Sequence, residues 1–217
     1  MKNLCLFDLD GTLTDPMVGI TKSLAYALDS FGIPVDDIDG LRKYIGPPLR
    51  DSFRDLYSFS EEEVERAVEK YREYYSEKGI FENVIYDGVV DMLESLKENG
   101  VRMVMATSKA AVYAERIAVH FDIGQYFEFI SGSELDGRRS RKSEVIEHAF
   151  ANISPVGRDA AVMIGDRKHD VIGAKEAGID SIGVTWGFGS LAELEEAAPT
   201  RIVDTPGGIF HAVKFTH

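Results

Sequence analysis

The spacing of hydrophobic residues changes along the chain, and each spacing predicts a different kind of element. The first apolar run, residues 3–7, is short and continuous, which is typical of a strand buried on both faces. Apolar residues then recur at helical spacing at Ile20, Leu24, Ala27, Leu28 and Phe31. This second pattern predicts an amphipathic helix that ends near Gly32.

A further helix is predicted by a capping box, in which Ser60 is followed at the third position by Glu63. The apolar face of this helix consists of Val64, Ala67, Val68, Tyr71 and Tyr75. No segment of residues 15–82 has convincing strand character. We therefore expect this whole region to be helical.

From residue 87 onward, helical and strand patterns alternate. Helices are predicted over residues 89–98, 109–121, 143–151 and 171–177, and strands over 101–106, 129–131, 160–164 and 181–184. Strands that alternate with helices indicate parallel βαβ units. We expect an α/β fold, with a doubly wound parallel sheet formed by residues 1–14 and 83–217. Residues 15–82 would form an α-helical cap domain inserted after the first strand.

Charge and composition limit the possible partners. The formal net charge is −13 at pH 7, whereas nucleic-acid binding needs basic patches that release counterions, so we expect no nucleic-acid partner. A small anionic substrate needs only a few focused cations. The first apolar stretch is interrupted by Asp8 and is too short for a signal peptide or a membrane helix, which predicts a cytoplasmic protein without a membrane partner. The single cysteine, Cys5, falls in the first strand and is expected in the core.

Two aspartates at the end of the first strand are the main candidates for chemistry. Asp8 and Asp10 precede a turn at Gly11, and the carboxyl ends of strands are where ligands bind in open α/β sheets. Two carboxylates about 4 Å apart would repel each other by roughly 4 kcal/mol, so positive charge must lie between them. A divalent metal would supply that charge. One carboxylate could then attack an electrophile while the other handles a proton.

Three later segments place polar residues at strand ends or helix starts. Thr107 and Ser108 follow a predicted strand, where hydroxyl and N–H groups could hold phosphate oxygens. Lys142 ends a basic run and opens a helix against the helix dipole, which suggests another partner for its charge. Asp166 ends a later strand and Asp170 opens the helix after it. Each segment alone also fits an ordinary cap or surface loop, but together they predict one phosphate-binding site whose oxygen ligands suit Mg²⁺.

In their order and spacing, these residues resemble the four motifs of the haloacid dehalogenase superfamily. The motifs are Asp8-Leu9-Asp10-Gly11-Thr12, Thr107-Ser108, Lys142, and Gly165-Asp166 with Asp170. The helical insertion is similar to the cap of the branch that contains phosphoglycolate phosphatase and β-phosphoglucomutase. The resemblance spans the whole chain and implies a Rossmann-like core with a helical cap.

The resemblance also implies roles for these residues. Asp8 would attack phosphorus to form an aspartyl phosphate, while Asp10 would protonate the leaving alcohol and later activate water. Mg²⁺ would be bound by the Asp8 side chain, the Asp10 backbone carbonyl and Asp166, with Asp170 as a direct or water-mediated ligand.

The same resemblance assigns phosphate binding to Thr107 or Ser108 and to Lys142, which would neutralise charge in the transition state. We expect a Mg²⁺-dependent phosphatase, phosphoglycolate phosphatase-like or 5′-nucleotidase-like. Its substrate would be a small phosphorylated metabolite, such as a hydroxy-acid phosphate, a nucleoside monophosphate or a sugar phosphate. The protein would act as a monomer or a homodimer.

Substrate selection is expected in the cap, where Arg42, Lys43 and Gly46 could contact the leaving group; an ordinary connector between helices would also explain this segment. Arg167 replaces a serine that is often found at this position in phosphoglycolate phosphatases, which argues against glycolate specificity. Residues 186–190 contain two glycines and predict a packed loop near the site.

Four alternatives to hydrolysis stay open. A phosphomutase uses cap groups that retain its intermediate, but residues 15–82 contain no histidine that could act as an acid or base. A phosphonatase needs a Schiff-base lysine in the cap, for which Lys22 and Lys43 are the candidates. A signalling module that is phosphorylated on aspartate would preserve its acyl phosphate, whereas Asp10 favours turnover. An inactive binding protein is the fourth alternative, although every motif position is filled.

Overall fold

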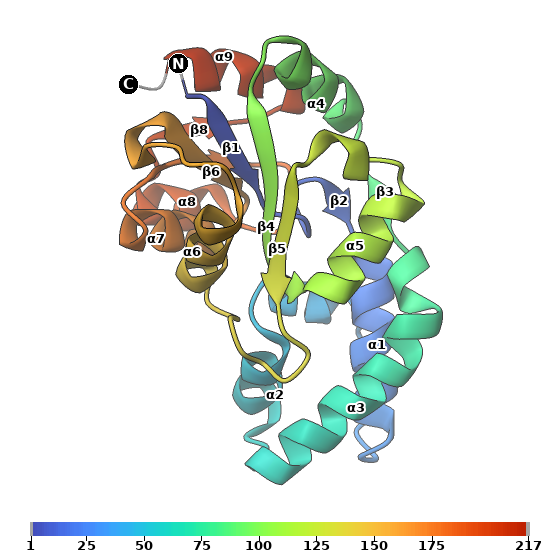
Figure 1. Cartoon of the computed structure of the whole chain (residues 1–217). Coiled ribbons are helices and arrows are strands. Elements are labelled where there is room, and N and C mark those ends of the chain that lie inside the picture. The colour runs from blue at the N-terminus through green and yellow to red at the C-terminus, as the bar shows by residue number, and fades with distance from the viewer. Residues whose placement is uncertain (1, 216–217) are drawn as a thin grey trace. The chain divides into compact units, whose positions relative to one another are not determined.

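The computed structural model describes residues 2–215, apart from the side chains of Lys43, Asp55 and Leu56. The chain divides into two compact units, drawn in Figure 1. The first unit consists of Met1–Asp15 and Ile85–His217, and the second unit consists of Pro16–Val84.

The first unit is built on a six-stranded sheet whose neighbouring strands are all parallel. Its strands are β1 (Leu4–Phe7), β4 (Arg102–Ala110), β5 (Phe129–Ser133), β6 (Ala161–Gly165), β7 (Asp180–Val184) and β8 (Arg201–Val203). They are arranged in the order β5-β4-β1-β6-β7-β8. The chain thus proceeds from β1 to one edge and then returns to the other side of β1, which confirms the predicted doubly wound α/β fold.

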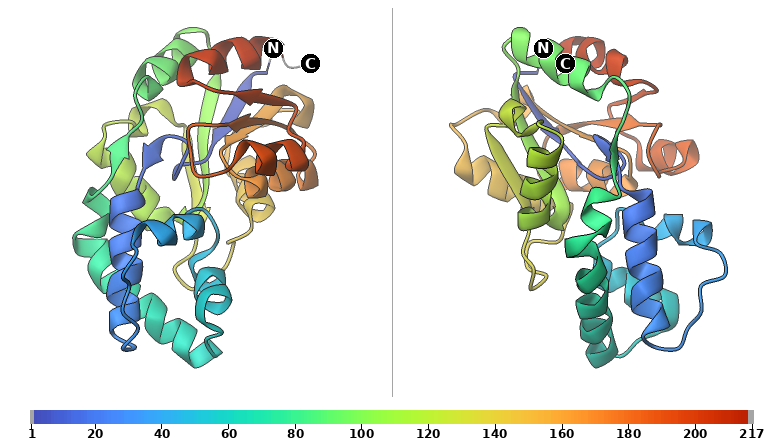
Figure 2. Two further views of the ribbon diagram at one scale, coloured as in Figure 1. Left: turned by 180° about the vertical axis from the view of Figure 1, so that it is seen from behind. Right: turned by 90° about the vertical axis from the view of Figure 1, so that its right-hand side faces the viewer.

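Helices cover both faces of this sheet, as Figure 2 shows. They are α4 (Val89–Glu98), α5 (Ala111–His120), α6 (Lys142–Asn152), α7 (Lys168–Glu176), α8 (Leu191–Ala197) and α9 (Ile209–Phe215), with short 3₁₀ turns at Gly124–Tyr126, Arg158–Ala160 and Pro206–Gly208. Leu4 and Leu6 pack with Val145 and Ile146 of α6, so these side chains form the core on one face. α4 and α5 belong to connections that run toward the opposite edge of the sheet from those of α6 and α7, and the handedness rule for parallel crossovers predicts that they lie on the other face. Cys5 is buried in β1, as predicted.

Several boundaries of elements in the first unit differ from the prediction. β4 extends to Ala110 and α5 begins only at Ala111, so the expectation that a helix begins at Lys109 is wrong. The register between β4 and β5 shifts between Ala106 and Ala110, and this irregularity prolongs the strand past its regular pairing. The pattern analysis also missed α8, β8 and α9, which are short.

The second unit contains the helices α1 (Met17–Asp29), α2 (Leu49–Tyr57) and α3 (Glu61–Glu77), with 3₁₀ turns at Asp39–Tyr44 and Gly79–Phe81. The predicted capping box opens α3: the Ser60 N–H donates to Glu63 Oε2 over 2.8 Å, and the Glu63 N–H donates to Ser60 Oγ. A two-stranded sheet of β2 (Thr14–Asp15) and β3 (Val84–Ile85) joins the segments where the chain enters and leaves this unit.

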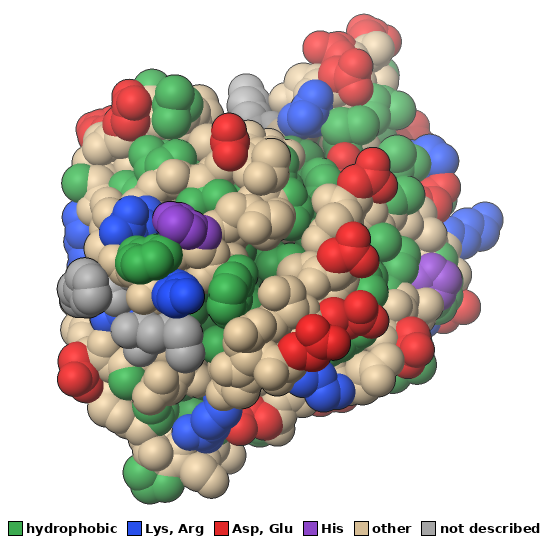
Figure 3. Space-filling view, turned by 90° about the horizontal axis from the view of Figure 1, so that it is seen from above, with side chains coloured by type: hydrophobic (Ala, Val, Ile, Leu, Met, Phe, Trp, Pro, Cys, Tyr) green, Lys and Arg blue, Asp and Glu red, His purple; other side chains and the backbone are tan. Residues whose placement is uncertain are grey.

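Charged side chains are distributed unevenly on the surface seen from above in Figure 3. Acidic side chains gather mainly on the right of this view, while Lys and Arg side chains occur singly or in small groups. In the described part of the chain, no helix combines the length and the hydropathy that crossing a membrane requires.

Candidate active site

The site forms at the central strand β1, on either side of which the chain connections run toward opposite edges of the sheet. Phe7, the last residue of β1, is in register with Met105 of β4 and Ile164 of β6. The Asp8 N–H continues this pairing by donating to the Ile164 carbonyl over 2.9 Å. The residues that follow β1 and β6, and the part of β4 beyond Met105, therefore meet at one sheet edge, at the topological switch point where α/β proteins bind ligands.

After β1 the backbone turns tightly. The Leu9 carbonyl accepts the N–H groups of Thr12, Leu13 and Thr14, and the Gly11 N–H donates to the Thr14 carbonyl over 2.8 Å. Gly11 has φ +86°, and a Cβ there would lie 2.3 Å from Asp166 Oδ2. Only glycine allows the turn to adopt this conformation so close to that carboxylate.

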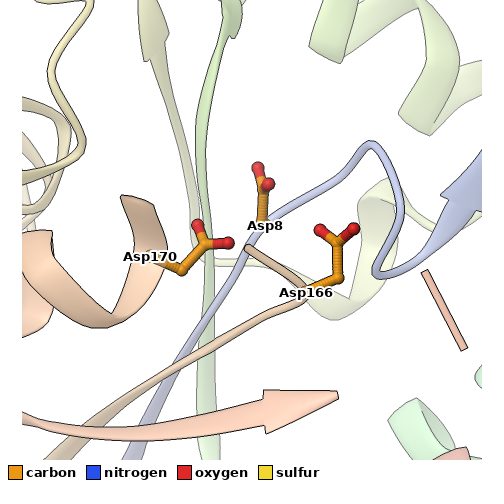
Figure 4. A group of neighbouring side chains, drawn as sticks. All are labelled: Asp8, Asp166 and Asp170. Carbon is orange, nitrogen blue, oxygen red and sulfur yellow. The ribbon is translucent and has the colours of Figure 1, made fainter. Parts of the chain in front are cut away.

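Three carboxylates converge at this edge. Asp8 follows β1, Asp166 follows β6 and Asp170 lies in the first turn of α7; Figure 4 shows their carboxylates directed into the same space. One oxygen of each lies within 4.8 Å of the others, and all three side chains are buried. The structure thus brings together three of the four residues that were predicted as metal ligands.

Lys142 connects two of these carboxylates. Its Nζ lies 2.9 Å from Asp8 Oδ1 and 2.8 Å from Asp170 Oδ1, and it donates to the Ala106 carbonyl over 3.0 Å. The Asp170 Oδ2 atom accepts the Arg167 N–H, which caps α7. The lysine that begins α6 against the helix dipole therefore does have another partner, the acidic site.

Asp10 lies apart from the carboxylate cluster. Its Oδ2 atom is 2.5 Å from the Nζ of Lys109, and both side chains are largely buried. The expected positive charge beside Asp8 and Asp10 is thus supplied by two lysines. Lys109 was not among the predicted site residues, although a lysine directly after the Thr107-Ser108 motif in so acidic a chain was a usable signal.

Burial shifts the proton equilibria of the site. The pKa of Asp166 is raised to about 8, chiefly by burial and then by the charges of Asp170 and Asp8. Burial likewise raises the pKa of Asp170 to about 6, although Lys142 opposes the shift. Burial also raises the pKa of Asp10 despite the attraction of Lys109. The pKa of Lys142 stays above its usual range because Asp170 and Asp8 overcome the effect of its own burial.

The loop formed by residues 186–190 holds Asp166 in place. The Phe188 N–H donates to Asp166 Oδ2 over 2.7 Å, and the Trp186 indole donates to the Thr12 carbonyl over 3.0 Å. A Cβ at Gly187 would lie 2.3 Å from the Gly11 carbonyl oxygen. The predicted packed loop therefore connects the first and fourth motifs through contacts that require a glycine at its centre.

Arg167 is directed toward α8. Its Nε donates to Glu193 Oε1 over 2.9 Å, and the Lys168 N–H donates to the same oxygen. The side chain is buried in this contact. The departure from serine at this position thus has a structural explanation in the anchoring of α7 to α8.

The remaining predicted residues occupy different places. Thr107 is buried beside Ala106, its Oγ1 accepts the Lys109 N–H, and Ser108 is partly exposed. Arg42 is exposed on a 3₁₀ turn of the second unit, and Gly46, with φ +107°, follows that turn. Lys43 lies outside the described side chains.

The donor set fits a hard divalent cation. Among the described residues, three buried carboxylates lie close together, Lys142 contacts two of them, and oxygen ligands of this kind suit Mg²⁺. Burial, followed by the charges of Asp170 and Asp8, raises the pKa of Asp166, and a bound cation would oppose this shift. The Asp10 carboxylate is not part of this group, so a role for Asp10 in metal binding would rest on its backbone carbonyl.

The fold, the four motifs and this geometry define a family. The family model of haloacid dehalogenase-like hydrolases matches residues 5–184. The chain belongs to this family of hydrolases, as its motifs indicated.

Two relatives and a solved structure are similar over most of the chain. A 5′-nucleotidase of Pseudomonas aeruginosa is 45% identical over 90% of this chain and 88% of its own. The tyrosine-protein kinase PtkA of Mycobacterium tuberculosis is 42% identical over 92% of this chain and 67% of its own. The crystal structure of a predicted phosphatase from Clostridium acetobutylicum is 46% identical, covers 99% of both chains and superposes with a TM-score of 0.95.

Proposed function

We propose that the chain is a Mg²⁺-dependent phosphatase that hydrolyses small phosphate monoesters through an aspartyl phosphate on Asp8. The observation that carries this proposal is the buried contact of Lys142 with both Asp8 and Asp170. A lysine held there places positive charge beside the Asp8 nucleophile and neutralises charge on an incoming phosphoryl group.

The proposed reaction has two steps. Asp8 attacks phosphorus and the ester P–O bond breaks while Asp10 gives a proton to the leaving oxygen, which releases the alcohol. The Asp10 carboxylate then takes a proton from water as that water attacks phosphorus, which releases phosphate and restores Asp8. Thr107, Ser108 and Lys142 would hold the phosphoryl oxygens during both steps.

Asp8, Asp166 and Asp170 would hold Mg²⁺, which supplies positive charge to the phosphoryl oxygens when it is bound. The close packing of the 186–190 loop against Asp166 supports this assignment, because a metal ligand has to be fixed in orientation. The second unit would act as the cap, with Arg42, Lys43 and Gly46 selecting the leaving group.

Nucleoside 5′-monophosphates are the first substrate class to test, because one relative is named as a 5′-nucleotidase. A hydroxy-acid phosphate and a sugar phosphate complete the panel. Of the two candidate Schiff-base lysines of a phosphonatase, Lys22 is disfavoured, because its ammonium lies 2.6 Å from Glu82 and the resulting hydrogen bond raises its pKa, whereas a Schiff-base lysine needs a lowered pKa.

The decisive experiment compares Asp8→Asn with Asp91→Asn, which changes an exposed carboxylate on α4. We expect Asp8→Asn to lose hydrolysis of p-nitrophenyl phosphate and of the whole panel in the presence of Mg²⁺. The loss should exceed about 1,000-fold, since the nucleophile is removed. Asp91→Asn should retain wild-type turnover. EDTA should stop hydrolysis by the wild type and by Asp91→Asn.

Phosphate release measured over many turnovers tests the competing functions. A wild-type protein that stops after one equivalent and keeps the phosphoryl group would support the signalling module instead. An Asp8→Asn variant with wild-type turnover would refute the assigned nucleophile.

A further inference from the structure

Lys109 directly follows the second motif in the sequence, and its side chain contacts the first motif. It lies in β4 where the register with β5 shifts, and its backbone N–H donates to Thr107 Oγ1 over 3.2 Å. Its side chain is only 7% exposed. A lysine is rarely buried to this extent unless its charge has a partner.

The Lys109 side chain contacts Asp10 of the first motif. The Lys109 ammonium holds Asp10 Oδ2 at 2.5 Å, so this oxygen of the carboxyl group is fixed. The other oxygen, Oδ1, is buried and has no hydrogen-bond partner among the described residues. A carboxyl group that is held by one oxygen has a defined plane, and its second oxygen keeps a defined direction.

A group that transfers protons has to be held in this way. Proton transfer needs the donor and acceptor atoms at hydrogen-bond distance in the reacting complex, and small misplacements reduce the rate strongly. Lys142 already provides the buried cation that contacts Asp8. Lys109 contacts the other aspartate of the first motif, so the two lysines have separable tasks.

We propose that Lys109 is a positioning residue that acts through Asp10, fixing Oδ2 so that Oδ1 faces the leaving-group oxygen. This inference rests on the proposed function, in which Asp10 protonates that oxygen as the P–O bond breaks. Lys109 then contributes to breaking the ester bond and little to binding the phosphate. The effect of removing it depends on how much the leaving group needs a proton.

The test uses Lys109→Met with two substrates of different leaving groups. p-Nitrophenol leaves readily without a proton, whereas an alkyl alcohol does not. We expect kcat/KM, which reports cleavage of the ester bond and not the later attack of water, to fall about 100-fold for an alkyl phosphate, which is within the range of general acid catalysis. kcat/KM for p-nitrophenyl phosphate should fall only a few-fold, and KM should rise for neither substrate. Lys109→Arg, which keeps the positive charge, should recover part of the alkyl-phosphate rate.

A double variant tests whether the effect passes through Asp10. In an Asp10→Asn background, Lys109→Met should cause no further loss of turnover of either substrate. The double variant also lacks the buried Asp10 carboxylate that Lys109→Met alone would leave without its partner. It can therefore be compared with Asp10→Asn even if the single variant Lys109→Met does not fold. Equal losses with both leaving groups, a raised KM, or an added loss in the Asp10→Asn background would overturn the proposal.

A structural measurement separates this inference from the proposed function. In crystal structures of the wild type and Lys109→Met, the Asp10 carboxylate should rotate or become disordered in the variant. An Asp10 carboxylate that stays in place without Lys109 refutes the positioning role, whatever the activity. If Asp10 moves but the wild type hydrolyses no phosphate ester, the proposed function fails and the positioning contact stands.

Discussion

Ion pairs in the two units have similar lengths but very different surroundings. In the second unit, Arg54 Nε lies 2.7 Å from Glu61 Oε1, and these side chains are 39% and 73% exposed. In the first unit, Lys142 Nζ lies 2.8 Å from Asp170 Oδ1, with side chains 3% and 2% exposed. Distance alone therefore says little about what an ion pair does.

The difference in burial separates two uses of charge. Water screens the pairs of the second unit, so each contributes at most about 1 kcal/mol to stability. At the site, desolvation offsets much of the attraction, and the buried charges depend on one another. The high cost of burying these carboxylates agrees with the chemical role proposed for them, whereas the exposed pairs lie on the surface of the helices.

The largest effect is expected when the buried cation Lys142 is removed, and removal of the exposed cation Arg54 is the comparison. Lys142→Met leaves Asp8 and Asp170 without their common partner, so the metal-free protein should lose about 3–5 kcal/mol of unfolding free energy. kcat should fall about 100- to 1,000-fold, because a stabilising charge is lost from the transition state. Urea unfolding and phosphate release measure the two effects.

Arg54→Met is the matched change in the second unit. It should alter the unfolding free energy by about 1 kcal/mol or less and leave turnover unchanged. If the two variants lose similar stability, the contrast between the units is wrong.

A smaller effect is expected from the loop that packs on Asp166. A methyl group at Gly187 would lie 2.3 Å from the Gly11 carbonyl oxygen and 2.4 Å from Asp166 Cβ, so Gly187→Ala must displace the loop or the carboxylate. We expect kcat to fall by about 10- to 100-fold and Mg²⁺ to bind more weakly. Trp186, the single tryptophan of the chain, should report Mg²⁺ binding by its fluorescence.

Gly207→Ala provides the control, because a Cβ there meets nothing within 4 Å. This variant should match the wild type in turnover and in Mg²⁺ titration. Unchanged Mg²⁺ binding in Gly187→Ala would show that the loop does not position Asp166.

The smallest effect is expected in the pH dependence of stability and of Mg²⁺ affinity, which arises from Asp166 at the site. The pKa of Asp166 is raised from 3.8 to about 8 in the folded metal-free protein. Between these values the folded state holds a proton that the unfolded state has lost, so the contribution of Asp166 to stability declines as pH rises from about 4 to about 8. Mg²⁺ binding releases this proton, so the affinity should increase on the order of tenfold per pH unit below about pH 8.

Asp166→Asn isolates this contribution. The unfolding free energy of the metal-free wild type, measured relative to this variant, should decline over that pH range, and isothermal titration of the wild type with Mg²⁺ should show the rising affinity. A difference that does not vary with pH would indicate that Asp166 is already ionised in the folded protein without metal.

The sequence was informative where function depends on strand ends. Asp8 and Asp166 each follow a short apolar strand, and a parallel sheet brings such ends to one edge. Lys142 could be singled out because a lysine at a helix start opposes the dipole. The capping box at Ser60 could also be predicted from the sequence, because both of its hydrogen bonds lie within one helical turn.

Two features of the site could not be predicted in this way. Lys109 contacts Asp10 from the part of β4 where the register with β5 shifts, and this irregularity leaves no periodic pattern in the sequence. The Phe188 N–H bond to Asp166 depends on a loop that follows a different strand. In both cases the partners are far apart in the chain, and only the packing of strands selects them.

The amino-acid sequence by itself determined the alternation of strands and helices, the helical second unit and the acidic residues at strand ends. These features follow from interactions between residues a few positions apart, or from the spacing of apolar side chains. The tertiary structure alone decided which lysine meets which aspartate and which glycines make room for a carboxylate. Those pairings are set by contacts across the sheet, where a shift of one residue changes every partner.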